Sequence, residues 1–278
     1  MDFGLSDEQR LLQDTVEQFL AKENDATQLR ARFDADEAFD RRLWRGMAEL
    51  GLAGLVIPEA HGGAGLALLD AALAAEMLGR AAAPGPFLGH TLASLALVLG
   101  GSAEQQRRWL PQLATGDALA TVAFAEPGGG WQPEEWHFPV GRTLSGVKEH
   151  VPYAASADLL VVGLAGGGLA LVERERGGVV IEAFPGVDRT RRLDTVRFEG
   201  SSAEELPGGA AAALRVRDAG LVLLAADAFG GASRLVDVTV AYANTREQFG
   251  VTIAHFQALK HQLANMALEV EPGRALYW

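Results

Sequence analysis

The feature that most constrains the fold is a change of hydrophobic period near residue 116 and a change back near residue 210. Before residue 116, apolar residues recur at the spacing of helices that bury one face. Between these points lie short apolar or alternating runs, typical of strands, at 119–125, 158–164, 168–173, 178–183 and 193–199. Helices, then strands, then helices predict an α+β fold and not the alternation of a parallel nucleotide-binding sheet.

The 278 residues therefore divide into three predicted domains. These are an N-terminal helical domain over 1–117, a middle antiparallel β-barrel domain over 118–208, and a C-terminal helical bundle over 209–278. The bundle contains Gly230-Gly231 inside a long helical pattern. Because glycine costs about 1 kcal/mol relative to alanine inside a helix, we expect a neighbouring helix or a ligand to approach closely there.

Local signals mark several helix ends. Ser6 with Gln9, and Ser102 with Gln105, have the spacing of capping boxes that begin helices. Gly51 follows a helical pattern over about 40–50, where a left-handed residue would end the helix. A helix over 66–78 is expected to end at Gly79, and another is expected over 91–99.

Composition excludes several classes of function. Acidic residues outnumber basic ones by 36 to 24, giving a net charge of −12, so nucleic acid is not an expected partner. The absence of cysteine excludes thiolate nucleophiles and iron–sulfur clusters, and the six histidines are too scattered for a metal site. With no signal region and no apolar run of membrane-spanning length, the sequence predicts a soluble cytoplasmic protein without a membrane span.

A direct search for catalytic motifs finds none. The chain has no Walker A sequence and no Gly-x-Ser-x-Gly nucleophile elbow. The adjacent acids Glu134 and Glu135 are more typical of a solvated loop than of a catalytic pair. If the chain serves a reaction, we expect the difficult step to belong to a bound cofactor.

Three sets of residues spread over the chain form a recognisable pattern. The first set consists of residues 5–9 and 51–65, and the second consists of residues 124–130 and 146–152. The third consists of residues 242–250, 253, 256–257 and 263–266. In order and separation they resemble the acyl-CoA dehydrogenase family. The third set, which begins Tyr-Ala-Asn-Thr-Arg-Glu-Gln-Phe-Gly, is the most specific.

This resemblance implies an FAD held between the middle and final domains, in a homo- or hetero-oligomer whose subunits share each flavin. The family's reaction removes the α proton of an acyl-CoA thioester with a carboxylate base, while the β hydrogen leaves as hydride to the flavin. The electrons then pass to an electron-transfer flavoprotein. The implied partners are thus an acyl-CoA substrate, that acceptor, and other family members.

The resemblance also assigns residues to the flavin. They are Phe124, Ala125, Gly130, His150, Pro152, Arg246, Phe249 and Gln257. The Arg246 guanidinium suits the pyrophosphate of the neighbouring subunit's flavin, with a surface ion pair to Glu247 as the alternative. Packed core is the alternative for Phe249, and a structural histidine is the alternative for His150.

Two single residues and one three-residue segment depart from the family pattern. Ala125 and Trp131 replace residues with hydroxyl groups, and His150-Val151-Pro152 replaces the usual Trp-Ile-Thr. Proline offers neither a hydroxyl nor an amide hydrogen. Each lost hydrogen bond weakens cofactor binding by about 1 kcal/mol unless water replaces it.

The catalytic base is unassigned. Most of the family places it beyond the position of residue 278, so the C-terminal domain is expected to be incomplete. A minority places it where this chain has Gly220. Asp218 is a poor substitute, because two residues turn a helical side chain by about 200°. Pro272 is expected to interrupt the last helix, and the apolar residues 275–278 that follow are expected to need a partner or further chain to cover them.

Three hypotheses follow. The chain is an FAD-dependent acyl-CoA dehydrogenase, or a poorly flavin-binding, non-catalytic subunit of a hetero-oligomeric one, or a degenerate scaffold protein. The acyl group is not identified, although Pro84-Gly85-Pro86 and the altered flavin segments favour a branched or polycyclic one.

Overall fold

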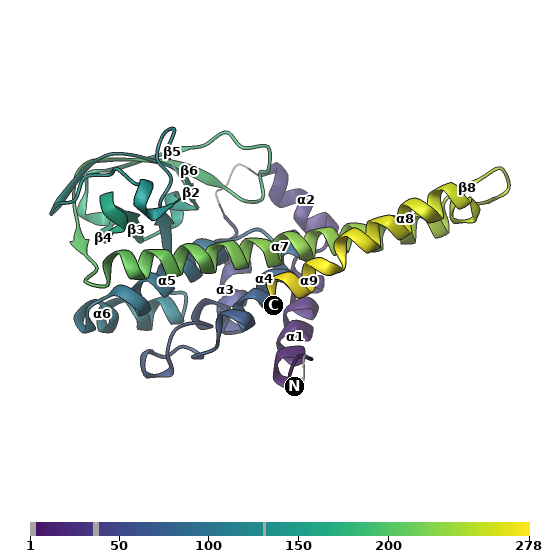
Figure 1. The fold of residues 1–278 in the computed structure, drawn as a ribbon, viewed down its shortest axis with the longest axis horizontal. Coiled ribbons are helices and arrows are strands. Elements are labelled where there is room, and N and C mark those ends of the chain that lie inside the picture. The colour runs from purple at the N-terminus through teal and green to yellow at the C-terminus, as the bar shows by residue number, and fades with distance from the viewer. Residues whose placement is uncertain (1–3, 36–38, 130–131) are drawn as a thin grey trace. The chain divides into compact units, whose positions relative to one another are not determined.

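The computed structural model describes residues 4–35, 39–129 and 132–278 (Figure 1). The helices are α1 (Asp7–Glu23), α2 (Ala26–Asp34), α3 (Arg41–Glu49), α4 (Leu68–Arg80), α5 (Phe87–Gly100), α6 (Ala103–Ala114), α7 (Gly209–Thr245), α8 (Gln257–Val270) and α9 (Pro272–Tyr277). The strands are β1 (Ala120–Ala123), β2 (Thr143–Pro152), β3 (Leu159–Gly163), β4 (Leu169–Glu173), β5 (Val179–Ala183), β6 (Leu193–Ser202), β7 (Glu204–Glu205), β8 (Glu247–Gln248) and β9 (Val251–Thr252). The order of helices, sheets and helices is the predicted one.

The predicted helix signals act as expected at the starts of α1 and α6. Ser6 Oγ accepts from Gln9 N at 3.2 Å while Gln9 Oε1 accepts from Ser6 N at 3.1 Å. Ser102 and Gln105 make the same pair of bonds, which satisfies N–H groups that the first helical turn leaves unpaired. Gly51 has φ of +83°, so it adopts the left-handed conformation predicted beyond α3.

Other helix boundaries were predicted wrongly. Helix α2 was not predicted, α5 begins at Phe87 and not near residue 91, and α4 continues through Gly79 to Arg80. Gly79 serves packing, because a Cβ there would lie 2.0 Å from the carbonyl oxygen of Asp227 on α7. The matching contact is at Gly230, whose Cβ would lie 1.9 Å from the Glu76 carbonyl oxygen. The expected close approach at Gly230 is thus confirmed, with a helix as the neighbour.

The middle strands form two sheets, in the orders β1-β3-β4-β7 and β2-β6-β5. A closed antiparallel barrel was therefore a wrong prediction for the described strands, and β1 pairs with β3 in parallel. Apolar runs predict strands but not their partners, and the long crossover that contains β2 allows β3 to return in the direction of β1. Both sheets contribute to one core, which includes Ala123, Leu144, Val151, Leu160, Val162, Val172, Val196 and Phe198.

Strand β2 was missed because two of its core-side positions are not apolar. Gly146 stands where a Cβ would lie 2.7 Å from the Phe138 ring. Lys148 has a fully buried side chain. Together they hide the alternation that would have predicted a strand, and Lys148 becomes central to the site described below.

The chain groups into two compact units. One comprises Ala26–Ala71 and Pro84–Leu221, and contains both sheets, α5 and α6. The other comprises the segment up to Asp25, Ala72–Ala83 and Val222–Trp278. In the second unit the part of α7 from Val222 onward leads into the β8–β9 hairpin, and α8 returns from it (Figure 1).

Helix α7 is long and apolar enough, by length and composition alone, to cross a membrane. Buried core helices of soluble proteins pass the same test. The backbone contacts at Gly79 and Gly230 give α7 a helix neighbour within its own unit. We therefore interpret α7 as a bundle helix, and the absence of a membrane span stays a prediction.

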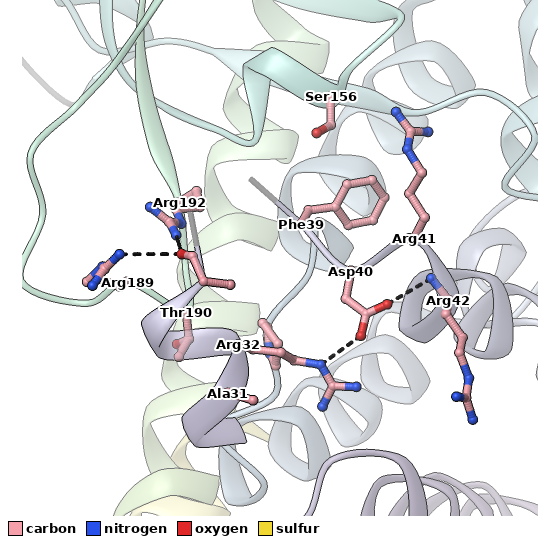
Figure 2. Close-up of a pocket in the computed structure, with 12 residues that line it drawn as sticks. Ala31, Arg32, Phe39, Asp40, Arg41, Arg42, Ser156, Arg189, Thr190 and Arg192 are labelled. Carbon is pink, nitrogen blue, oxygen red and sulfur yellow. Dashed lines mark hydrogen bonds and ion pairs between the residues drawn. The ribbon is translucent and has the colours of Figure 1, made fainter. Parts of the chain in front are cut away.

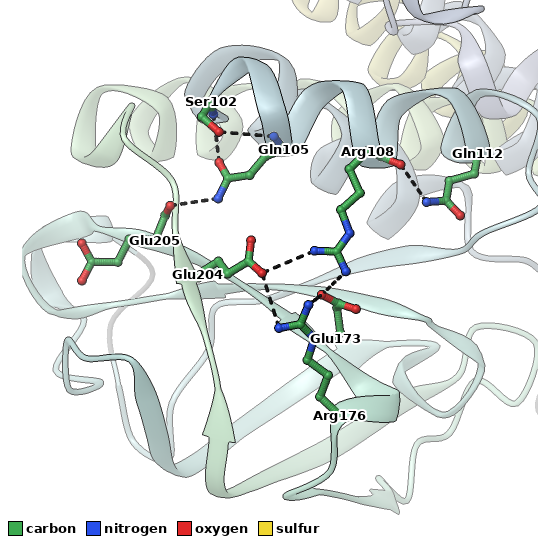
Figure 3. Close-up of polar contacts among 8 residues, drawn as sticks. All are labelled: Ser102, Gln105, Arg108, Gln112, Glu173, Arg176, Glu204 and Glu205. Carbon is green, nitrogen blue, oxygen red and sulfur yellow. Dashed lines mark hydrogen bonds and ion pairs between the residues drawn. The ribbon is translucent and has the colours of Figure 1, made fainter.

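An ionic network holds α6 against the four-stranded sheet (Figure 3). Arg108 on α6 binds Glu173 at 2.6 Å and Glu204 at 3.4 Å, and Arg176 binds the same two carboxylates at 2.7 and 3.6 Å. These side chains are 20 to 44% exposed, so each pair adds at most about 1 kcal/mol of stability. The network fixes the direction of α6 relative to the sheet more than it stabilises the fold.

The buried imidazole of His90 makes folding stability depend on pH. Burial lowers the pKa of His90 to about 4, and its Nε2 lies 3.0 Å from the Leu113 carbonyl oxygen. The unfolded chain binds this proton near pH 6.5, so stability is lost as pH falls from about 6.5 towards 4. We expect the free energy of unfolding to fall by about 3 kcal/mol over this pH range. Urea unfolding at several pH values should show that the free energy of unfolding of the wild type falls between about pH 6.5 and 4, and that this fall is lost in His90→Gln. An equal dependence on pH in both proteins would contradict the role of His90.

Candidate functional site

The two segments assigned to the flavin in the middle of the chain lie side by side. Strand β1 leads directly into Phe124 and Ala125, and β2 ends at Pro152. Glu149 N donates to the Ala125 carbonyl oxygen at 2.9 Å. Thr121 Oγ1 donates to the Pro152 carbonyl oxygen at 2.6 Å. These bonds place the segment 124–129 beside residues 149–152, and the two together are called the edge below.

A buried ion pair lies beneath this edge. Lys148 Nζ donates to Glu126 Oε1 at 2.7 Å and to the Phe124 carbonyl oxygen at 3.0 Å. The same Nζ lies 4.8 Å from the ring centroid of Phe138 and 5.6 Å from that of Trp136, within the range of cation–π attraction. The ammonium is therefore held on several sides by the two segments and the loop between them.

Glu126 is held as firmly as its partner. Its carboxylate accepts from the backbone N–H groups of His137 and Phe138 at 3.0 Å each. The Lys148 ammonium and these amides together outweigh partial burial and lower the pKa of Glu126. Burial lowers the pKa of Lys148 to about 8, so both groups are mainly charged at neutral pH. Sequence reasoning noted these residues only as members of motifs, since nothing local pairs positions 126 and 148.

The outer side of the 124–129 segment offers backbone groups to a ligand. Within the described part of the chain, no hydrogen bond from the half-buried Ala125 N–H is found. Gly128 has φ of +64°, and a Cβ there would meet no atom within 4 Å. An unused donor three residues before an open glycine fits a polar ring edge such as that of a flavin, even though Ala125 has no hydroxyl. Gly130 and Trp131 lie outside the described residues.

The two predicted flavin residues on β2, His150 and Pro152, differ in how exposed they are. His150 is exposed, has φ of +55°, and rests its ring 4.4 Å from that of Phe184. Pro152 is half-buried, and its carbonyl oxygen already accepts from Thr121. His150 can therefore present a ring face or nitrogen at the edge, whereas Pro152 contributes shape only. Both cofactor roles stay predictions.

Arg246, Phe249 and Gln257 belong to the second unit, at the β8–β9 hairpin and the start of α8. Phe249 and Gly250 both have positive φ, at +56° and +79°, which gives a two-residue turn of the type that suits hairpins. The Phe249 side chain is 93% exposed, so the packed-core alternative is not observed within this chain. No ion pair of the exposed Arg246 occurs among the described residues, which leaves its guanidinium available to an anion.

The structure supplies no carboxylate base at the start of α7. Asp218 is 62% exposed at its side chain and pairs with Arg217 at 2.7 Å, while Arg217 also donates to Gln132. Gly220 is buried, and a Cβ there would lie 3.3 Å from Leu92 Cδ1. The catalytic base stays unassigned. No group of three or more metal-binding side chains occurs among the described residues.

A cavity of about 760 Å³ lies elsewhere in the first unit (Figure 2). It is lined by Ala31, Arg32, Ala35, Phe39, Asp40, Arg41, Arg42, Pro84, Ser156, Arg189, Thr190 and Arg192. Arg32 Nε binds Asp40 at 2.8 Å, and Arg192 donates to the Ala35 carbonyl oxygen at 2.6 Å. Of the predicted flavin residues that the structure describes, none lines this cavity.

The side chain of Tyr153 links the end of β2 to residues that line the cavity. Tyr153, which follows Pro152, donates its hydroxyl to the Thr190 carbonyl oxygen at 2.5 Å and accepts from Gly85 N at 2.8 Å. Its ring meets Phe39 edge-on at 6.1 Å between centroids. Tyr153 thereby fixes the end of β2 against the cavity wall.

Two family models match the chain. Residues 6–117 match the acyl-CoA dehydrogenase N-terminal domain, and residues 208–278 match the acyl-CoA dehydrogenase C-terminal domain. Among relatives, acyl-CoA dehydrogenase IpdE2 of Mycolicibacterium smegmatis is 34% identical over 276 residues, which is 98% of this chain and 76% of the relative. The matches cover both helical ends, and the relative spans the sheets as well.

Solved structures show the same similarity. The Tcur3481-Tcur3483 steroid ACAD G363A variant has a TM-score of 0.88 at 35% identity, and the ChsE4-ChsE5 complex from Mycobacterium tuberculosis has 0.88 at 27%. Each match covers 98% of this chain and 76% of the other. An acyl-CoA dehydrogenase complexed with FAD from Bacillus anthracis has a TM-score of 0.85 at 29% identity, over 98% of this chain and 51% of that one.

Proposed function

Because this chain belongs to the acyl-CoA dehydrogenase family, we propose that it takes part in the FAD-dependent α,β-dehydrogenation of an acyl-CoA thioester. The observation that supports this most is the edge formed by 124–129 and 149–152, joined by the bond from Glu149 N to Ala125 O. Bound FAD supplies the hydride acceptor that no side chain can provide.

In this proposal the residues of the chain bind the flavin and orient it. The Ala125 N–H and the open backbone at Gly128 face a flavin, and His150 closes the edge beside them. Arg246, Phe249 and Gln257 are exposed on the other unit and serve a flavin shared with a neighbouring subunit. A guanidinium matches a pyrophosphate through two parallel hydrogen bonds.

A second candidate is a non-catalytic or weakly flavin-binding subunit of a hetero-oligomeric acyl-CoA dehydrogenase. Ala125 and Pro152 favour it, because each replaces a residue that usually donates to the flavin. The similarity to the ChsE4-ChsE5 complex supports an assembly of two different family members.

We also propose a bulky polycyclic acyl group as the substrate class. The support is the 35% identity to a steroid acyl-CoA dehydrogenase, together with the altered residues at the flavin edge. Electrons would leave through an electron-transfer flavoprotein, and we place the reaction in the cytoplasm. Reduction of the bound flavin by a panel of straight-chain, branched and polycyclic acyl-CoA compounds tests the substrate class.

Co-expression separates the two candidates. The chain is purified alone and after co-expression with a second family member, and flavin absorbance is measured with and without acyl-CoA. Flavin that is bound by the chain alone and bleached by acyl-CoA supports the enzyme. Flavin gained only in the mixed assembly supports the subunit. A protein that is colourless in both preparations contradicts both candidates.

A further inference from the structure

The peptide between Phe124 and Ala125 has a defined orientation. Its carbonyl oxygen accepts from Lys148 Nζ, which is fully buried beneath the edge. The peptide is trans, as is every peptide bond described in the structure, so its N–H points roughly opposite to its C=O. The Ala125 N–H therefore points away from Lys148, and no hydrogen bond from it is found among the described residues.

We propose that Lys148 is a positioning residue for the cofactor: its ammonium holds the Phe124 carbonyl inward and so aims the Ala125 N–H at the flavin. This inference rests on the proposed function. Because Ala125 has no side-chain donor, the segment contacts a flavin through backbone groups. The direction of those groups then decides how strongly the flavin is bound.

The surroundings of Lys148 suit this role. Its ammonium cannot move towards water, because Trp136 and Phe138 cover it and Glu126 holds it at 2.7 Å. Glu126 is itself anchored by the backbone of residues 137 and 138. Trp136 stacks on Phe124 with ring centroids 4.9 Å apart. A cation at the carbonyl also polarises the peptide, which makes its N–H a stronger donor.

Lys148→Met tests the proposal, because methionine has a similar length and can pack against Trp136 and Phe138. The protein, with its partner subunit if it needs one, is stripped of flavin and titrated with FAD by fluorescence quenching. We expect the Kd for FAD to rise about tenfold, and the visible band of the saturated variant to shift. A purely structural role would leave that band unchanged at saturation. Lys22→Met, at a side chain that is 83% exposed, should match the wild type.

A second measurement keeps the proposal testable if Lys148→Met does not fold. In the wild type, the Ala125 amide should exchange with solvent quickly without FAD and become protected when FAD binds, as followed by NMR. Protection supports the proposal. An amide that stays unprotected, or a folded Lys148→Met with unchanged FAD affinity, overturns it. A wild type that binds no FAD in any assembly overturns the proposed function as well, which distinguishes the two failures.

Discussion

Substitution of Gly230 by alanine is expected to lower the free energy of unfolding by about 3 kcal/mol. The new Cβ would lie 1.9 Å from the Glu76 carbonyl oxygen and 2.9 Å from Arg80 N. Both atoms belong to the backbone of α4, so neither helix can accommodate the methyl group without moving apart. Thermal unfolding followed by circular dichroism measures the effect.

The neighbouring glycine provides a matched control. A Cβ at Gly231 would lie 3.6 Å from the Gly79 carbonyl oxygen, which is ordinary van der Waals contact. Gly231→Ala should therefore be neutral, or stabilise α7 by up to about 1 kcal/mol through its higher helix propensity. Equal losses in the two variants would show that α4 and α7 do not cross at Gly230.

The second large effect is expected at Glu76. This carboxylate is 3% exposed and accepts from Gln13 Nε2 at 3.1 Å, from Arg274 Nη1 at 3.1 Å and from the Tyr277 hydroxyl. Burial and then the Glu76 carboxylate raise the pKa of Tyr277, which keeps its hydroxyl a donor. Glu76→Leu removes the acceptor that these three donors share, and we expect the free energy of unfolding measured in urea to fall by about 3 kcal/mol.

Glu17→Leu is the control for this substitution. Glu17 also binds an arginine, Arg80, at 3.5 Å, but its side chain is 57% exposed. Exposed ion pairs contribute at most about 1 kcal/mol, so the midpoint should shift little. If both variants lose the same stability, the Glu76 cluster does not hold α9 to α4.

The cluster also changes how the end of the chain is understood. Pro272 was expected to interrupt the last helix, and it does mark the start of α9, at a first-turn position where proline is tolerated. Residues 275–278 were expected to form an uncovered apolar tail. Leu276 is 85% exposed, but Tyr277 is buried and bound to Glu76.

Features of the fold that depend on local chemistry could be predicted from the sequence. The capping boxes at Ser6 and Ser102 and the left-handed Gly51 need only nearby residues. The strand partners could not be predicted, because the parallel pairing of β1 with β3 depends on where β2 packs. The sequence wrongly predicts a helix end at Gly79, because the atom that requires a glycine there, the Asp227 carbonyl oxygen, belongs to a residue that is distant in sequence.

The candidate site, too, could be predicted from the sequence only in part. The resemblance assigns the segments 124–130 and 146–152 to the flavin, which stays a prediction, and the structure joins their described parts through the bond from Glu149 to Ala125. The Lys148–Glu126 pair was not predicted, because a lysine usually indicates a solvent-exposed position. The arginine-lined cavity was missed too, since its walls come from residues 31–42, 84, 156 and 189–192.

The most direct test of the central claim is bleaching of the protein's bound flavin by an acyl-CoA. The chain, alone or assembled with its partner subunit, is loaded with FAD and mixed anaerobically with a polycyclic acyl-CoA. We expect the flavin absorbance to fall as the enoyl-CoA product forms. Flavin that binds but keeps its absorbance with every acyl-CoA, in every assembly, would contradict a role in acyl-CoA dehydrogenation.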